Sequence, residues 1–505
     1  MQGLSELNRE LLDASALCRQ LVREGSVEAF LADHRHDLFP DEMFEDLFTS
    51  KRGRPSIPAD TVASVMVLQA LEGLSDRDAA RALTDRISWK VACGLALDEA
   101  GFDYSVLTYW RSRLRNSTRP ERIFEAVRSV IDATGVLKGK TRRALDSTLL
   151  DDVVATQDTV TQLIAAIRRV RRVVPGASGV ALLAHDYDTP AKPLIAWDDE
   201  VARAELVHAL VADARRLLDT CGDVKGDEGV AATSLLALVA GQDVELDDEG
   251  HWRIVRAVAK DRVISVVDPE ARHMHKSRSV YRDGFKAHLV VEPETGLITG
   301  ARLTSASTPD GPTGVELLKD EEPGLQVLAD SAYGSGETLA ALGRGGHQRA
   351  IKPHPSTSAV AGGLERDDFV VDEDRATVTC PAGHIVAMTA KRNVNFGARC
   401  ANCPLRSRCT TARHGRHFTL SLHDAQLVES RRAWRDGDFI SDYRKYRPMV
   451  ERSIAWLVRD HYRRVRFRGV KRNQMGLSTR VGAINLRRLV TLGLIHDAGW
   501  QLATT

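Results

Sequence analysis

The sequence lacks long apolar stretches. No window approaches the 18 or so uncharged apolar residues that a membrane-spanning helix requires. The opening segment, MQGLSELNRELLDASAL, has the spacing of an amphipathic helix rather than the pattern of a signal peptide. Hydrophobic residues make up 43% of the chain and charged residues 28%, which is typical of folded, water-soluble proteins. We therefore expect a cytoplasmic protein, and 505 residues are enough for roughly two to four domains.

The chain also lacks a large net charge. The formal net charge is +1, so the molecule as a whole is not a polycation. The charge is unevenly placed, however, because residues 442–488 contain 14 Lys and Arg against three acids. A local basic block of this kind can bind nucleic acid while the net charge stays near zero.

Cysteine is scarce, with seven residues in the chain, and four of them fall within 30 positions. Their spacing is C-x19-C-x2-C-x5-C, with His384 four residues after the first. Clustered thiolates favour a structural Zn²⁺ site over a disulfide framework in a reducing compartment. Unligated thiols, a redox pair, or His384 in place of one cysteine remain alternatives. The four candidate zinc ligands are Cys380, Cys400, Cys403 and Cys409.

The N-terminal part predicts short helices. After the basic linker SKRGRPSIPAD (50–60), apolar residues recur at helical spacing up to Gly73, and Ser75 with Asp78 is typical of a helix cap. A third helix is expected over 103–115. These features indicate a helix-turn-helix-like DNA-binding bundle, or else a small bundle with a solvated basic face. The candidate DNA contacts are the linker residues Arg52 and Arg54, which resemble a minor-groove arm, and Arg111, Arg113 and Arg115.

The rest of the chain alternates between strand and helix patterns. Two apolar runs joined by Pro-Glu-Thr-Gly at 293–296 predict a hairpin, and the final segment from Ser441 to Gly469 has the composition of a basic helix. The expected parts are a helical N-terminal domain (1–138, with the bundle at about 51–116), core segments 139–156, 261–353 and 426–505, a mainly helical insertion 157–260, and a Cys-rich insertion 354–425.

Three carboxylates stand out from this pattern. Asp330 ends the apolar run QVLAD, where it is either a helix N-cap or a metal ligand at the lip of a sheet. Asp146 interrupts a strand at 141–152. Glu451 lies on or beside an apolar helical stripe, so we expect it to have a cation or a hydrogen-bond partner. Arg447, one turn earlier, is the candidate for a structural salt bridge. The nearby acids are expected in surface, capping or turn positions: Asp151, Asp152 and Asp310.

Five segments, in order, resemble the DDE transposases of bacterial insertion sequences: RGRPSIPADTVASVMVLQALEGLSDRDAARAL, ALDSTLL, DGFKAHLVVEPETGLITGARLTSAS, VLADSAYGS and YRPMVERSIAWLVR…NLRRL. The resemblance implies an α/β protein with an RNase H-like catalytic core. Its mixed central sheet would follow a helical DNA-binding domain and be interrupted by the two insertions. Asp146, Asp330 and Glu451 match the family's three acids in turn.

The resemblance further implies two Mg²⁺ (or Mn²⁺) ions, cleavage and strand transfer at terminal inverted repeats, and a homodimer on DNA in the bacterial cytoplasm, at the nucleoid. Alternatives are a nuclease of the same core or a catalytically silent DNA-binding descendant. Arg447 has the family's spacing to Glu451 and is a further candidate DNA contact. Tyr443 and Tyr446 each lie one position from the usual tyrosine, and Val458 replaces the usual lysine. Further candidate phosphate contacts, or a solvated helix face, are Arg459, Arg463, Arg464, Lys471 and Arg472.

Overall fold

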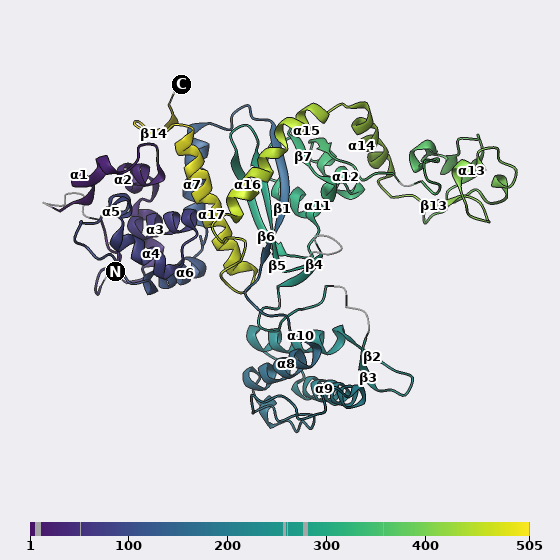
Figure 1. Cartoon of the computed structure of the whole chain (residues 1–505), viewed down its shortest axis with the longest axis horizontal. Helices are drawn as coiled ribbons and strands as arrows, with labels where there is room; N and C mark the ends of the chain where they lie inside the picture. Colours follow the sequence, from purple (N-terminus) through teal and green to yellow (C-terminus); the bar gives the residue numbers. More distant parts are fainter. Residues whose placement is uncertain are drawn as a thin grey trace.

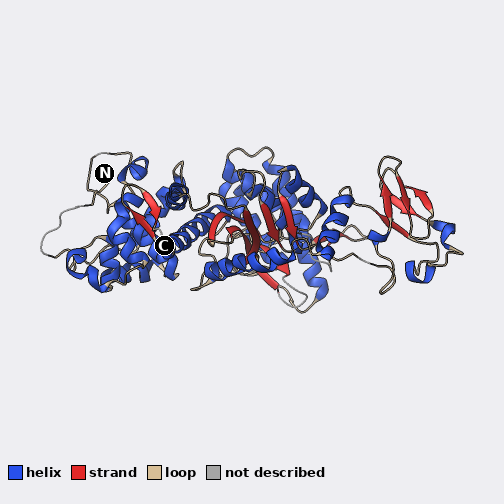
Figure 2. Cartoon of the chain, turned by 90° about the horizontal axis from the view of Figure 1, so that it is seen from above, coloured by secondary structure: helices blue, strands red, loops and turns tan. Residues whose placement is uncertain are grey.

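The structure is a computed structural model that describes residues 1–5, 12–50, 52–255, 259, 261–275, 281–356 and 358–503, with His275 as backbone only. Four parts are visible in Figure 1: an N-terminal group of helices, a central sheet with helices on it, a helical insertion, and a small lobe at the far end. Figure 2 shows the strands of that lobe set apart from the central sheet. None of the helices described is long and apolar enough to cross a membrane.

The N-terminal helices largely follow the sequence pattern. Gly73 ends the first predicted helix in the left-handed conformation (φ 67°), and the Ser75 hydroxyl accepts a hydrogen bond from Asp78 N, which confirms the predicted cap. A short additional helix, α5, was not predicted. Residues 6–11 of the predicted first helix lie outside the described residues. The helices are α1 (Ala14–Cys18), α2 (Val27–Leu38), α3 (Ala59–Glu72), α4 (Asp76–Asp85), α5 (Ile87–Cys93), α6 (Ser105–Asn116) and α7 (Arg122–Thr134).

The central sheet is mixed. Strand β1 (Arg142–Asp151) pairs antiparallel with β5 (Tyr281–Glu292) and parallel with β7 (Gln326–Ala329). The sheet continues through β8 (Gln348–Ile351), parallel to β7, while β6 (Leu297–Ser305) and β4 (Arg272–His275) both pair with β5. The β5–β6 pair is the hairpin predicted around residues 293–296, and it is confirmed.

Helices cover both faces of this sheet. Ala144 of β1 belongs to a core shared with α16 (Pro448–Val458) and α17 (Val470–Thr491), whereas Leu145 packs with α11 (Asp310–Leu317) and α12 (Gly336–Arg344). Because successive side chains of a strand point to opposite faces, Asp146 shares the face of Ala144. The carboxylate of Asp146 is therefore directed toward the layer that contains α16.

The two insertions have separate cores. Helices α8 (Thr159–Val173), α9 (Glu200–Cys221) and α10 (Asp227–Gln242) pack on one another beside the hairpin of β2 (Val244–Leu246) and β3 (Trp252–Ile254), as the helical patterns predict. The Cys-rich lobe is built from short pieces: β9 (Val370–Asp372), β10 (Thr377–Thr379), β11 (Ile385–Ala387), β12 (Asn393–Asn395), α13 (Arg406–Cys409) and β13 (His417–Thr419). Helix α14 (Asp424–Asp436) leads back to the core.

The prediction of one basic helix in the last segment is wrong. The chain forms α15 (Ile440–Tyr446) and α16, then leaves the helix at Arg459, and α17 begins only at Val470. Asp460 and His461 have left-handed backbones (φ 58° and 65°), which a continuing α-helix does not allow. The loop at 459–469 instead pairs with the end of β1, through Asp151 N to Arg463 O (2.8 Å) and Val465 N to Asp151 O (2.8 Å).

Helix α17 joins the N-terminal helices to the core, and it lies between them in Figure 1. Its Arg480 is buried and donates hydrogen bonds to the carbonyls of Leu71 at the end of α3 and of Trp456 at the end of α16, at 3.0 and 2.8 Å. Gly73 lies so close to the 459–469 loop that a Cβ there would be 1.9 Å from Asp460 O. The two parts are thus packed backbone to backbone.

Candidate active site

One arginine brings the three predicted carboxylates together. The Arg447 Nη2 atom lies 2.9 Å from Asp146 Oδ2 and 4.0 Å from Asp330 Oδ2, and its Nη1 lies 3.2 Å from Glu451 Oε1. The Arg447 side chain is buried, with an exposed fraction of 6%. Residues separated by up to 305 positions therefore converge on a single guanidinium.

Each acid is placed by the local fold. Asp330 follows β7 directly, and its Oδ1 accepts a hydrogen bond from Ala332 N (2.9 Å) at the start of a 3₁₀ turn, η4 (Ser331–Tyr333). The capping and site interpretations of this residue are thus compatible. Pro448 at the first turn of α16 lets Arg447 stand as its N-cap, one turn before Glu451.

The environments of the acids differ. Burial raises the pKa of the Asp146 carboxyl, and the charge of Arg447 opposes that shift. Glu451, in contrast, is 65% exposed, so its predicted position beside the buried stripe is wrong, although the ion pair with Arg447 is present. The reason is that Ser453 and Leu457, not Glu451, face the core of α16.

The donor set fits a hard divalent cation. Carboxylate oxygens are the ligands that Mg²⁺ prefers, and three carboxylates against one guanidinium leave two negative charges for an ion to balance. Within the described residues, the Nε of Arg447 is buried without a hydrogen-bond partner. The carboxylate oxygens of the three acids do not all lie within 4.8 Å of one another. In this structure the acids are linked instead through their ion pairs with Arg447.

Sequence reasoning missed a second polar cluster near these acids. Lys286 Nζ and His288 Nδ1, both from β5, lie 3.2 and 3.5 Å from Asp310 Oδ1. The prediction of a turn at Asp310 is wrong, since Asp310 begins α11. Burial lowers the pKa of His288, which keeps it neutral. The i, i+2 spacing of Lys286 and His288 within the otherwise apolar run 285–291 was the available signal.

Tyr333 lies close to Asp310, Asp146 and Asp330. Its burial, and then the charges of these acids, raise the pKa of its phenol.

The two acids after Asp146 are unlike each other. Asp151 is partly exposed and pairs with Arg282 at 2.6 Å, as a surface residue does. Asp152 is buried, which corrects its predicted surface or capping position. Its backbone bonds to Asp283 O, and its carbonyl accepts from Arg464 Nε (3.0 Å), so it is held beneath the 459–469 loop.

The burial of Asp152 predicts a pH-dependent stability. Desolvation raises the pKa of its carboxyl from 3.8 to about 6. The folded state therefore binds a proton more tightly than the unfolded chain does. Stability should fall by up to about 1.4 kcal/mol per pH unit as pH rises between these two values. We expect the amides at the end of β1 to be better protected from hydrogen exchange in Asp152→Asn than in the parent chain at pH 8, with a smaller advantage at pH 5. An equal advantage at both pH values would contradict this.

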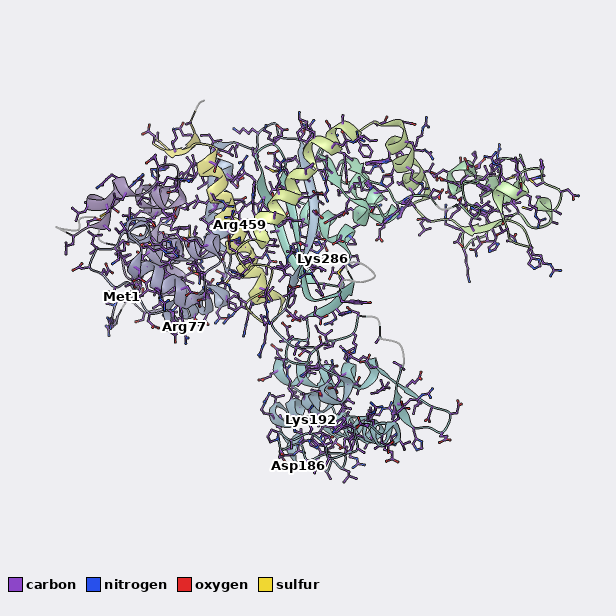
Figure 3. The ribbon with its side chains drawn as sticks, in the orientation of Figure 1. Met1, Arg77, Asp186, Lys192, Lys286 and Arg459 are labelled. Atoms are coloured by element: carbon purple, nitrogen blue, oxygen red, sulfur yellow. The ribbon has the colours of Figure 1, made fainter. Side chains whose placement is uncertain are left out.

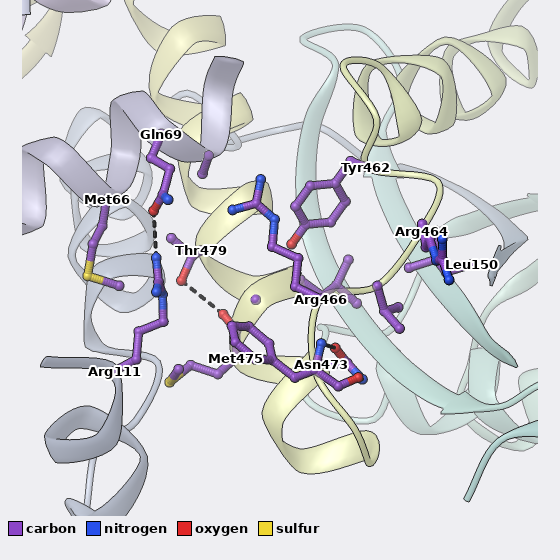
Figure 4. Close-up of a pocket in the computed structure, with 15 residues that line it drawn as sticks. Met66, Gln69, Arg111, Leu150, Tyr462, Arg464, Arg466, Asn473, Met475 and Thr479 are labelled. Atoms are coloured by element: carbon purple, nitrogen blue, oxygen red, sulfur yellow. Dashed lines mark hydrogen bonds between the residues drawn. The ribbon is translucent and has the colours of Figure 1, made fainter. Parts of the chain in front are cut away.

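The predicted DNA contacts of the helical bundle fall into two groups. Arg52 and Arg54 are exposed. Arg111, in contrast, pairs with Asp76 (2.7 Å) and Gln69 (2.6 Å), and Figure 4 shows it directed across a pocket toward Gln69. Arg113 donates to Leu47 O and lies over the rings of Phe48 and Tyr109, while Arg115 bonds Ser112.

The basic residues of the last segment are also divided. Arg463 donates to Thr148 and to Leu149 O, and Arg464 to Asp152 O, so both anchor the loop to β1. Arg459 follows the last residue of α16, in the position labelled in Figure 3, and pairs with Asp460 at 3.0 Å. Lys471 and Arg472, in the first turn of α17, are exposed.

The four clustered cysteines line one pocket of the Cys-rich lobe, together with His384. Burial raises the pKa of the Cys409 thiol. The charge of Arg416 opposes this shift, and the other three cysteines add to it. Within the described residues, no three of these ligand atoms lie within 4.8 Å of one another. The four thiols thus line the same pocket but are too far apart to bind one ion in this arrangement.

Two regions of the chain match known protein families. The fold and the site define a mixed α/β protein whose three clustered carboxylates lie on β1, directly after β7 and on α16. Residues 379–490, which include Arg447 and Glu451, match the Transposase DDE domain, and residues 18–113 match the Transposase domain (DUF772). Searches of curated proteins and of solved structures found no match. Together the two family matches indicate an insertion-sequence DDE transposase, which confirms the resemblance stated above. Such transposases act on DNA and generally use divalent metals such as Mg²⁺.

Proposed function

We propose that this protein cleaves the ends of an insertion sequence and joins them to target DNA, with Asp146, Asp330 and Glu451 as the catalytic triad of an RNase H-like core. The observation that carries the proposal is the convergence of all three carboxylates on Arg447. The order of strands supports it as well, since β6, β5 and β1 are antiparallel and β7 and β8 continue in parallel. Two acids on neighbouring strands and one on a helix then meet at one side of the sheet.

The three carboxylates would hold the metal, with Asp146 nearest the centre of the sheet. Two Mg²⁺ or Mn²⁺ ions, when bound, supply activation of the attacking oxygen and stabilisation of the leaving oxygen at the phosphodiester. Arg447 balances the charge of the acids and limits their mutual repulsion, which otherwise raises carboxylate pKa values. Tyr443 lies in the same electrostatic neighbourhood: burial raises the pKa of its phenol, and the nearby acids add to that shift.

DNA binding would use the exposed cations rather than those already engaged. Arg52, Arg54, Lys471 and Arg472 are free to neutralise phosphates, whereas Arg111, Arg463 and Arg464 have partners within the protein. A homodimer would let each copy bind one terminal inverted repeat. Binding should weaken steeply with added salt.

The decisive experiment is a strand-transfer assay with the inverted repeats that flank the gene, in Mg²⁺ or Mn²⁺. Cleaved and joined products would support the proposal. Cleavage without joining would indicate a nuclease of the same core, and salt-sensitive binding without cleavage would indicate a catalytically silent DNA-binding protein. Omission of the divalent ion should abolish both products while leaving binding.

We also propose structural Zn²⁺ at Cys380, Cys400, Cys403 and Cys409. Thiolates bind Zn²⁺ tetrahedrally, and the four cysteines line one pocket that would close around the ion. When both are purified without chelator, the Cys403→Ser variant should contain one equivalent of zinc less than the parent chain, measured by elemental analysis. Cys18→Ser, at an isolated cysteine in the N-terminal helices, is the matched control. Equal zinc in both variants would exclude this site.

A further inference from the structure

Two histidines and one aspartate converge where the two ends of the chain meet. His34 and Asp37 lie one turn apart on α2, and His496 ends β14 (Leu494–His496), which pairs with β15 (Trp500–Leu502) in a C-terminal hairpin. The Nδ1 atoms of His34 and His496 lie 3.6 and 3.4 Å from the same oxygen, Asp37 Oδ2. Within the described residues, this is the one group of three metal-binding side chains whose ligand atoms all lie within 4.8 Å of one another.

These separations fit a shared ion better than direct hydrogen bonds. Charge-assisted hydrogen bonds are shorter, about 2.7–2.9 Å. Around tetrahedral Zn²⁺, bonds of about 2.0–2.2 Å to nitrogen and oxygen place neighbouring ligand atoms about 3.3–3.5 Å apart. The two nitrogen–oxygen distances are close to that value. The ligand atoms of all three side chains lie within 4.8 Å of one another, so an adjustment of the side chains would let them share one ion.

The surroundings restrict the rings. The His496 ring packs on Trp500 with centroids 4.2 Å apart, and the His34 ring lies between Phe30 and Trp500 at 5.1 and 6.0 Å. Aromatic neighbours that fix the imidazoles reduce the entropy lost when a ligand binds. All three ligand side chains are partly exposed, so water can reach a fourth coordination position.

We propose that His34, Asp37 and His496 bind a Zn²⁺-type transition metal ion that fastens the C-terminal hairpin to the N-terminal helical domain. Two imidazoles favour such a metal over Mg²⁺, which prefers oxygen ligands throughout. The site is remote in sequence from the carboxylates and from the clustered cysteines, and it requires neither of them. Its role is structural: the ion links α2 to the segment that follows α17.

Zinc content and thermal melting of the full chain test this site. The chain stripped with EDTA and then given Zn²⁺ should bind one equivalent more than the His34→Ala/His496→Ala variant. Added Zn²⁺ should also raise the melting temperature of the parent chain by a few degrees more than it raises that of the double histidine variant. Asp37→Asn, at a partly exposed position, should lose the same equivalent. It keeps a similar side-chain shape, which guards against a failure to fold.

The matched control is Asp497→Asn, which removes a neighbouring exposed carboxylate from the same hairpin. It should bind as much zinc as the parent chain. Because each comparison is a difference from the parent, zinc at the cysteines cancels. Equal zinc content in the parent, Asp37→Asn and the double histidine variant would overturn the proposal. Co²⁺ in place of Zn²⁺ gives a second measurement. The difference in absorption between the parent and the double histidine variant should contain no thiolate charge-transfer bands.

Discussion

Asp146→Asn should lower strand cleavage by at least about a thousandfold while leaving DNA binding nearly unchanged. A thousandfold corresponds to about 4 kcal/mol of transition-state stabilisation, within the range that metal-assisted phosphoryl chemistry supplies. The amide has nearly the shape of the carboxylate but lacks its charge, so it cannot serve as a strong ligand for a hard cation. Single-turnover cleavage of a labelled terminal repeat, together with a gel-shift titration, measures both quantities. Asp330→Asn and Glu451→Gln should behave alike.

The matched control is Asp151→Asn on the same strand. Asp151 is five residues from Asp146, on the opposite face of β1, and pairs with Arg282 instead of Arg447. The control should cleave at close to the parent rate. If Asp146→Asn retained cleavage, the residue would leave the triad. If both variants lost activity together with their fold, measured by circular dichroism, the loss would be structural.

How much of this site is readable from the sequence depends on the kind of contact. Asp330 was identifiable because an apolar run ends at it abruptly, and Asp146 because a carboxylate interrupts a strand. The resemblance supplied Glu451 and the spacing of Arg447. Nothing in the pattern indicated that one guanidinium would contact all three acids, since that depends on how α16 packs on β1 and β5.

The largest misinterpretation concerned the basic segment after α16. Its composition is compatible with a helix, but Arg463 and Arg464 gain more from bonds to the end of β1 than from a solvated helical face. Tertiary contacts of this kind override local propensity. The same holds for Arg111, whose partner Asp76 is 35 positions away on another helix. A row of arginines in a sequence therefore does not distinguish phosphate contacts from internal ion pairs.

Arg480→Ala should be among the most destabilising single changes in the chain, by about 3–5 kcal/mol. The guanidinium donates to the carbonyls of Ala70, Leu71, Trp456, Leu457 and Arg459, and it lies over the Tyr462 ring. Burial lowers its pKa to about 10, so it stays protonated at neutral pH. Its removal leaves several buried carbonyls without donors and opens a cavity between α3, α16 and α17.

The readout is hydrogen exchange at backbone amides of α3 and α16, because a chain of several domains has no single free energy of unfolding. Both helices should lose protection together, since Arg480 joins their ends. Arg472→Ala, at an exposed position of the same helix, should leave protection unchanged. Loss confined to α17 would instead show that Arg480 stabilises only its own helix. A joint loss would mean that the N-terminal helices and the central sheet are held as one body, so that under the proposed function DNA bound by the helices would be presented at a fixed position to the three carboxylates.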